Sequence, residues 1–257
     1  MQKKRLALFG LILALTSAAC LATGAPQAQS TSSAPPPAAD LVFKTPEDAI
    51  NAYMQGVAQN DIQKIAQACA INEMSEKFKF DLYTQRLGGI FMPAQFLSPA
   101  TSPFFIETNK MKLSSQVFDR VKMLTYSLLS SENVSDGSPI TGMDAGRIEA
   151  FMKDLDPKRL SGLAVEQIVL PNKTLMSDAK YLDNANKMAL IYGADEQTER
   201  VVLFSFEKNE YFIGFTLLRY GQNWKISSQI SALSNSNQLG AAQKITPTEF
   251  QNMNGGG

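Results

Sequence analysis

Apolar residues recur at intervals of three and four over residues 46–69, which is the period of an amphipathic helix. Thr45 and Pro46 supply a capping side chain and a favoured first helical residue, so we expect a helix to begin there. Asn60 and Asp61 interrupt the run, and a second short stripe follows. We therefore predict two consecutive helices. Their apolar positions are Ile50, Tyr53, Met54, Val57, Ala58, Ile62, Ile65, Ala66 and Cys69.

The same helical period recurs further along the chain and predicts helices at 75–87, 115–130 and 144–155. The first two are separated by a segment, 88–108, that is rich in proline and phenylalanine and has no regular period. We interpret this segment as irregular chain whose aromatic side chains complete the core. The alternative is that they present an apolar contact surface. The side chains concerned are Phe91, Phe96, Phe104 and Phe105.

After about residue 160 the pattern becomes alternating, which is typical of half-buried strands. Polar turn residues at 208–209 and 221–222 are typical of hairpins. Helices first and an antiparallel sheet of four or five strands last indicate an α+β fold, with the N-terminal helices packed on a curved sheet. The polar segment 234–257 is expected to be a flexible tail. The expected strands are residues 164–170, 187–192, 200–206, 211–220 and 224–231.

The first twenty residues combine positive charge, an apolar run and a cysteine. Three cations precede a ten-residue apolar run at 6–15, which is shorter than the about 20 residues that a membrane-spanning helix requires. Small residues and Cys20 follow, and the whole resembles the bacterial lipoprotein signal. The resemblance implies that 1–19 is a cleaved signal peptide and that Cys20 carries the lipid, a diacylglycerol with palmitate-type chains. The alternative is an ordinary secretory signal cut after Ala22 or Ala25.

Residues 20–40 are rich in Ala, Ser, Pro and Gln and lack the large apolar side chains that a core needs. Three prolines at 35–37 favour an extended spacer. At roughly 3 Å per residue this segment would hold a domain several nanometres from a membrane. We therefore expect a disordered tether and a single domain at 41–233, located outside the cytoplasm and anchored to the cell membrane, or else secreted.

Histidine is absent from the chain, which excludes Ser-His-Asp catalysis and imidazole metal sites. The 24 cations and 24 anions balance, and loss of three signal-peptide cations leaves 21 against 24, a net charge of −3. No basic patch predicts nucleic-acid binding, and no motif predicts a metal or a cofactor. With Cys20 lipidated, Cys69 has no disulfide partner. Cys69 lies on an apolar helix face, where we expect a buried structural thiol.

The capped helix from Thr45, the polar break after it and the closing hairpin at 211–226 resemble the nuclear transport factor two-like, cystatin-like superfamily. The likeness covers residues 45–70 and 164–231, and we interpret the segment between, about 71–160, as a helical insertion. The resemblance implies a cone-like domain in which a curved sheet wraps around the first helix and leaves a cavity.

Members of this superfamily include isomerases, dehydratases, ligand binders and interaction modules, so the resemblance does not choose a function. The absence of a catalytic motif favours a non-catalytic binding module, whose partner would be an envelope protein or a small hydrophobic ligand. In the second case Tyr53, Met54 and Trp224 would line the pocket. The other alternative is a ketosteroid-isomerase-like enzyme, which needs a carboxylate and a tyrosine. Glu166 and Glu207 fall near strand ends or on outer faces, so no inward carboxylate is expected.

Overall fold

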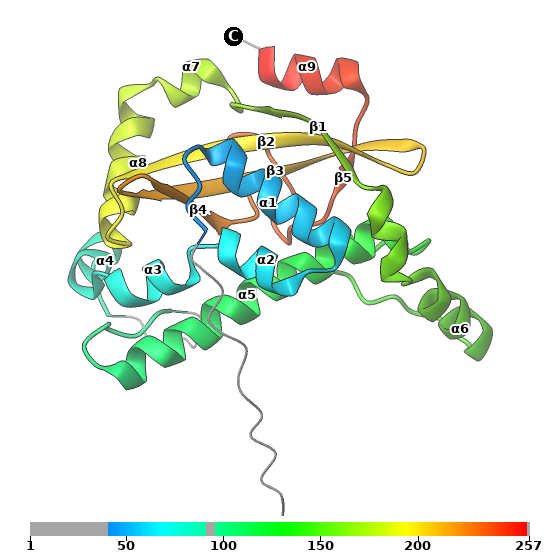
Figure 1. Cartoon of the computed structure of the whole chain (residues 1–257), viewed down its shortest axis with the longest axis horizontal. Helices are drawn as coiled ribbons and strands as arrows, with labels where there is room; N and C mark the ends of the chain where they lie inside the picture. Colours follow the sequence, from blue (N-terminus) through cyan, green and yellow to red (C-terminus); the bar gives the residue numbers. More distant parts are fainter. Residues whose placement is uncertain (1–40, 91–95, 256–257) are drawn as a thin grey trace, which may run out of the picture. The chain divides into compact units, whose positions relative to one another are not determined.

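The computed structural model describes residues 41–90 and 96–255 (Figure 1). The expected signal peptide 1–19, the expected lipidation site Cys20 and the expected tether 20–40 lie outside the described residues, as does Phe91.

Residues Asp40–Gly257 form one compact unit. In its described residues, buried apolar side chains between Phe43 and Met253 form hydrophobic clusters. Segment 40–257 therefore carries its own core, and we expect it to fold without the residues before it.

Helix α1 (Pro46–Gln59) begins and ends at its sequence signals. The Thr45 hydroxyl accepts a hydrogen bond from the Asp48 backbone nitrogen at 3.1 Å, and the Asp48 carboxylate accepts one from the Thr45 nitrogen at 3.0 Å. This reciprocal cap satisfies two backbone donors at the helix start. Asn60, in the left-handed conformation, ends α1, and α2 (Ile62–Ala68) follows. Both predicted helices are confirmed.

The described part of the predicted insertion 71–160 is mostly helical. The helix expected at 75–87 is two helices, with Phe78 at the end of the first. The elements are α3 (Ile71–Lys77), α4 (Phe80–Leu87), α5 (Pro103–Leu129), α6 (Ala145–Asp154) and a 3₁₀ helix, η1 (Pro157–Gly162).

Helix α5 is longer than its periodicity predicts. It begins at Pro103 rather than 115, because the Ser102 hydroxyl caps it by accepting a hydrogen bond from the Phe105 backbone nitrogen at 3.4 Å. Phe104 is 71% exposed and Phe105 is 39% exposed. The prediction that these two side chains complete the core was therefore wrong, since the helix turns both of them outward.

The sheet is antiparallel, with strand order β1-β2-β3-β4 and with β5 paired to β3. Glu207 and Gly221, both with positive φ, make the two hairpin turns. The predicted α+β architecture with four or five antiparallel strands is confirmed. The strands are β1 (Ala164–Val169), β2 (Glu196–Phe206), β3 (Asn209–Tyr220), β4 (Asn223–Ser228) and β5 (Gln243–Lys244).

The segment 187–192, for which the apolar pattern predicts a strand, is instead the end of helix α8 (Ala179–Ile191) and its cap; a short helix, α7 (Lys173–Met176), precedes α8. The Asp178 carboxylate starts α8 by accepting hydrogen bonds from two backbone nitrogens of its first turn, at 2.9 and 3.2 Å. A six-residue apolar run fits a buried strand or a buried helix equally well. The start signal at Asp178 decides for the helix.

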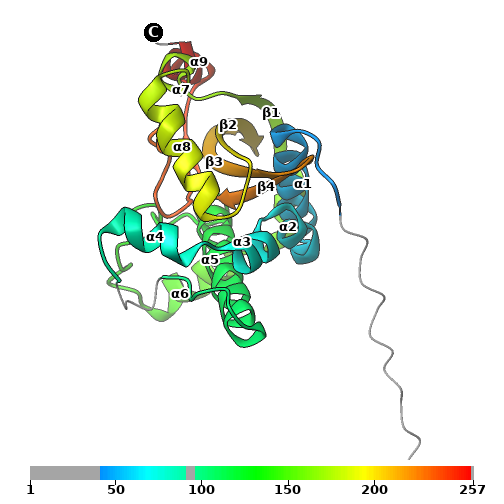
Figure 2. The same cartoon turned by 90° about the vertical axis from the view of Figure 1, so that its left-hand side faces the viewer.

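The two faces of the sheet carry different layers, because side chains alternate along each strand. Val202, Phe204 and Phe206 of β2 belong to the main core with α1 and the C-terminal part of α5. Val201 and Leu203 lie on the opposite face, which α9 (Pro247–Gly255) covers. Figures 1 and 2 show α1 and α2 on one side of the sheet and α8 and α9 on the other.

Segment 234–257, for which its polar composition predicts a flexible tail, is folded onto the domain in its described part. Strand β5 pairs with Tyr211 and Phe212 of β3. Helix α9 places Phe250, 1% exposed, against Val201 and Leu203. A polar segment can therefore dock through one large aromatic side chain when the sheet face offers it an apolar site.

Candidate functional site

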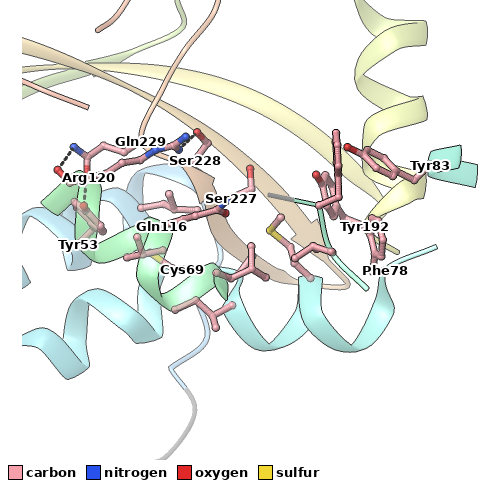
Figure 3. A pocket seen from close by; sticks show the side chains of 18 residues that line it. Tyr53, Cys69, Phe78, Tyr83, Gln116, Arg120, Tyr192, Ser227, Ser228 and Gln229 are labelled. Carbon is pink, nitrogen blue, oxygen red and sulfur yellow. Dashed lines mark hydrogen bonds between the residues drawn. The ribbon is translucent and has the colours of Figure 1, made fainter. Parts of the chain in front are cut away.

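A cavity of about 260 Å³ lies between helices α3 and α5 and strand β4 (Figure 3). Helix α1 contributes Tyr53 to its wall, and the residue after α2 contributes Cys69. The volume is just below the range of roughly 300–1,000 Å³ that is usual for small-molecule sites. The cavity is therefore large enough for a small organic molecule.

One end of the cavity is aromatic, as Figure 3 shows. The ring centroid of Phe78 lies 5.4 Å from that of Tyr83 and 5.9 Å from that of Tyr192, and Phe96 lies 5.5 Å from Tyr83. Burial raises the pKa of Tyr192 to about 12, so its phenol is neutral. This end offers a ligand mainly apolar contact. The wall continues with Met74, Leu97 and Leu113.

The other end of the cavity is polar and is held by a chain of hydrogen bonds. The Tyr53 hydroxyl donates to Gln229 Oε1. Gln229 Nε2 in turn donates to the backbone oxygens of Gly240, at 2.6 Å, and of Arg120, at 3.2 Å. Burial raises the pKa of Tyr53 well above its ordinary value, with a smaller contribution from Cys69. Tyr53 is thus a neutral phenol whose proton is already committed to Gln229.

The C-terminal segment builds part of this polar end. A Cβ atom at Gly240 would lie 2.9 Å from Gln229 Nε2 and 3.1 Å from Arg120 Cβ. Gly240 also has a φ of +85°, which favours glycine. The backbone at Gly240 therefore packs directly against the side chains of Gln229 and Arg120.

Arg120 of α5 supplies the positive charge of the cavity wall. Its guanidinium donates a hydrogen bond to Ser228 Oγ of β4. Burial lowers the pKa of Arg120, while Tyr53 and Cys69 act weakly in the opposite direction. An arginine nevertheless stays protonated in proteins. Within residues 41–90 and 96–255, no carboxylate lies within ion-pair distance of Arg120.

The Cys69 thiol lies in the same wall and is free. Burial raises its pKa to about 12, an effect that Lys225 opposes and Glu73 reinforces. A thiol with this pKa is protonated at neutral pH, and a protonated thiol is a poor nucleophile. The expected burial of Cys69 is confirmed by its 4% exposure.

Of the three residues that the sequence predicts to line a pocket, the structure places one in the cavity wall. Tyr53 lies in the cavity wall. Met54, 0% exposed, and Trp224, 8% exposed, are buried in the main core and are not part of that wall. Glu166 is exposed and Glu207 lies in the β2–β3 turn, so neither reaches the cavity.

Arg120 and Gln229 are the site residues that the sequence reasoning missed. Arg120 had a usable signal: it stands three residues after Val117 and four before Leu124, which places a cation within an apolar helical stripe. Gln229 had none, because its partners come from distant parts of the chain.

A buried carboxylate was also missed, but it belongs to the other face of the sheet. Glu199 of β2 accepts hydrogen bonds from Ser231 Oγ at 2.6 Å, the Leu233 backbone nitrogen at 3.1 Å and the Tyr181 hydroxyl at 3.3 Å. Glu199 and Val201 are two positions apart on β2, so their side chains point to the same face of the sheet. On that face Val201 packs under α9. Glu199 therefore fixes the chain after β4 and does not enter the cavity.

Among the described residues, no three His, Cys, Asp or Glu side chains gather as a metal site would require. In the same residues, no helix combines the length and the apolar character needed to span a membrane.

Comparison with known proteins gives one structural likeness. No protein-family model and no curated protein matches the chain. The structure is similar to the crystal structure of a cystatin-like protein from Ruminococcus gnavus ATCC 29149, with a TM-score of 0.53 and 17% sequence identity. The alignment covers 78% of this chain and 44% of that protein's chain, so the chain spans less than half of that protein's length. At this identity the likeness concerns the fold alone, and the chain has a cystatin-like α+β fold.

Proposed function

We propose that this protein is a non-catalytic binding protein that holds a small, largely apolar molecule in the cavity, while a lipid on Cys20 anchors it outside the cytoplasm. The observation that carries the first part is the cavity itself, with aromatic side chains such as Phe78 at one end and polar ones such as Arg120 at the other. A mostly apolar pocket with a few convergent polar groups is the usual form of a ligand site.

Binding is a better account of this cavity than catalysis. Isomerase chemistry of the ketosteroid kind needs a carboxylate base next to the substrate, and the described lining contains neither aspartate nor glutamate. The Cys69 thiol is protonated, and the Tyr53 hydroxyl donates to Gln229. The titratable groups in the wall are therefore suited to shape a pocket rather than to move protons.

The cavity proposal is tested by native mass spectrometry. Segment 40–257 is exported into the envelope of a bacterial host behind a cleavable signal and purified without denaturation. We expect a reproducible extra mass that is lost on denaturation. Gln116→Trp, in the cavity wall of α5, should reduce the occupied fraction at least about tenfold, whereas Ser115→Trp, exposed on the same helix and outside the wall, should not. An unliganded wild-type mass, even after exposure to envelope extract, would contradict the proposal.

The anchor rests on the n-region, apolar run and cysteine of the sequence, and it has its own test. The full chain is expressed in bacteria that are fed an alkyne analogue of palmitate. Wild-type protein should become labelled, Cys20→Ser should not, and Cys69→Ser should retain the label, because these are the two cysteines of the chain. A label that survives in Cys20→Ser, or an unlabelled wild type, would favour the ordinary secretory signal instead.

A protein-interaction role is the second candidate, and the exposed apolar side of α5 favours it. Phe104 and Met111 are 71% and 72% exposed and stand seven residues apart, on the same side of the helix. Cross-linking in the envelope should then yield a partner that a Phe104→Ser, Met111→Ser variant loses and an Ile148→Ser, Met152→Ser control on α6 keeps. Identical cross-linked species from both variants would remove this candidate.

A further inference from the structure

We propose that the ligand of this cavity is a small amphipathic acid whose anionic group binds the Arg120 guanidinium and whose apolar body lies against the aromatic end. This inference rests on the proposed function and names the class of molecule that the site would take. It follows from the bonding of Arg120, the arrangement of the cavity and the cost of burying a charge.

The guanidinium of Arg120 is only partly used by the protein. It has five N–H donors, and its described bond is the one to Ser228 Oγ. Of the other arginines in the described part of the chain, Arg86 is exposed and donates a hydrogen bond to Asn184 Oδ1 rather than to a carboxylate. Four others form ion pairs with distances of 2.6 to 3.0 Å: Arg147 with Glu132, Arg159 with Glu207, Arg200 with Glu47 and Arg219 with Glu196.

The neighbours of Arg120 do not compete for its charge. The Tyr53 hydroxyl donates its hydrogen bond to Gln229, and the Gln229 amide nitrogen donates to backbone oxygens. The Cys69 thiol is held protonated by burial. Among the residues that the structure describes, the polar end therefore contains one cation and no anion, so an acidic ligand group would supply the missing charge. Arginine also matches a carboxylate with two parallel N–H donors.

The size and polarity of the cavity limit the rest of the ligand. The volume of about 260 Å³ lies just below the usual range for ligand sites, so the ligand must be a small molecule. Figure 3 shows Arg120 at the opposite end of the wall from Phe78, Tyr83 and Tyr192. A molecule with an acid at one end and an aryl or short alkyl group at the other fits this arrangement, whereas a sugar or a nucleotide does not.

A partly buried cation without a counter-ion is a cost to the folded protein, because burial removes hydration that no partner replaces. If Arg120 serves binding, its replacement by glutamine should leave the unliganded domain as stable as wild type or more stable. If Arg120 instead served only to hold α5 against Ser228, the same replacement should lower the unfolding temperature. Thermal unfolding of segment 40–257 thus separates the two roles.

The binding test uses two compounds of nearly equal size, 3-phenylpropionate and 3-phenylpropionamide, titrated calorimetrically into segment 40–257 at neutral pH. We expect wild type to prefer the acid by about tenfold or more. Arg120→Gln should lose this preference and keep its affinity for the amide, and Arg120→Lys should retain part of it. Arg147→Gln, which removes an arginine outside the cavity wall, should behave as wild type.

Equal affinity of wild type for the two compounds, or a preference for the acid that Arg120→Gln retains, would overturn the assignment while leaving a binding cavity in place. Failure of wild type to bind either compound would also overturn it for ligands of this size. The native mass measurement tests independently whether the cavity holds a ligand, because it does not depend on the charge of the bound molecule.

Discussion

Replacing Phe250 with alanine tests whether helix α9 is an integral part of the folded domain. The side chain of Phe250 is 1% exposed and packs with Val201, Leu203 and Phe212 on the outer face of the sheet. A polar tail that only rested on the surface would tolerate the change. A docked helix would lose its main apolar anchor.

The magnitude follows from the burial. Truncating a fully buried phenylalanine to alanine costs about 3–5 kcal/mol of unfolding free energy. Helix α9 lies at one edge of the domain, where the surroundings can partly close the space, so we expect about 3 kcal/mol for Phe250→Ala. With a denaturant slope of about 2 kcal/mol per M, the urea midpoint should fall by about 1–2 M.

The assay is urea unfolding of segment 40–257 followed by tryptophan fluorescence, since Trp224 lies in the main core. Phe104→Ala is the matched control: it removes the same side chain from a position that is 71% exposed, and its cost should stay below about 0.5 kcal/mol. Equal midpoints for the two variants, or a loss below about 1 kcal/mol for Phe250→Ala, would refute the docking of α9.

Three further predictions concern the interior. Tyr53→Phe should cost about 1–3 kcal/mol in denaturant unfolding, because the buried Oε1 of Gln229 loses its donor; a neutral result would contradict the hydrogen bond. Gly214→Ala should cost about 1–3 kcal/mol or more, because its Cβ would lie 2.6 Å from a backbone nitrogen, whereas Gly162→Ala, with open space around it, should be near neutral. Native Cys69 should resist alkylation at pH 8 until the domain unfolds. Because its pKa is raised from 9.0 to about 12 in the folded state, its contribution to stability is complete below about pH 9 and is lost as the pH rises toward 12. Just above pH 9, the unfolding free energy of a Cys69→Ala variant should fall less steeply with pH than that of wild type. An identical fall in the two proteins would contradict the raised pKa.

The sequence predicted the elements whose signals are local. Helix α1 is specified by its own residues, since Thr45 and Asp48 cap it and Asn60 ends it. Elements that depend on distant chain were predicted wrongly or not at all. The apolar run at 187–192 has no unique local solution, and the docking of Phe250 requires a site that exists only once β2 and β3 have paired.

The same division applies to the candidate site. Tyr53 was found because an apolar helical stripe points an aromatic side chain inward, and Arg120 stands at stripe spacing and was open to the same reasoning. Gln229 and Gly240 were not, since a glutamine just after a strand and a glycine in a polar segment are ordinary residues by themselves. Their roles arise from contacts with α5 across more than one hundred residues of chain.

The bonding within the polar end also bears on why the chain has a cation at position 120. Tyr53, Gln229 and the backbone at Gly240 are neutral groups that form hydrogen bonds with one another. These groups therefore do not need the charge of Arg120. An apolar side chain at that stripe position would continue the core and avoid the desolvation of a charge. Residues that lower stability without helping the fold are typical of functional sites. The position that breaks the apolar pattern of α5 is therefore the position at which a ligand, rather than the protein, is expected to complete the structure.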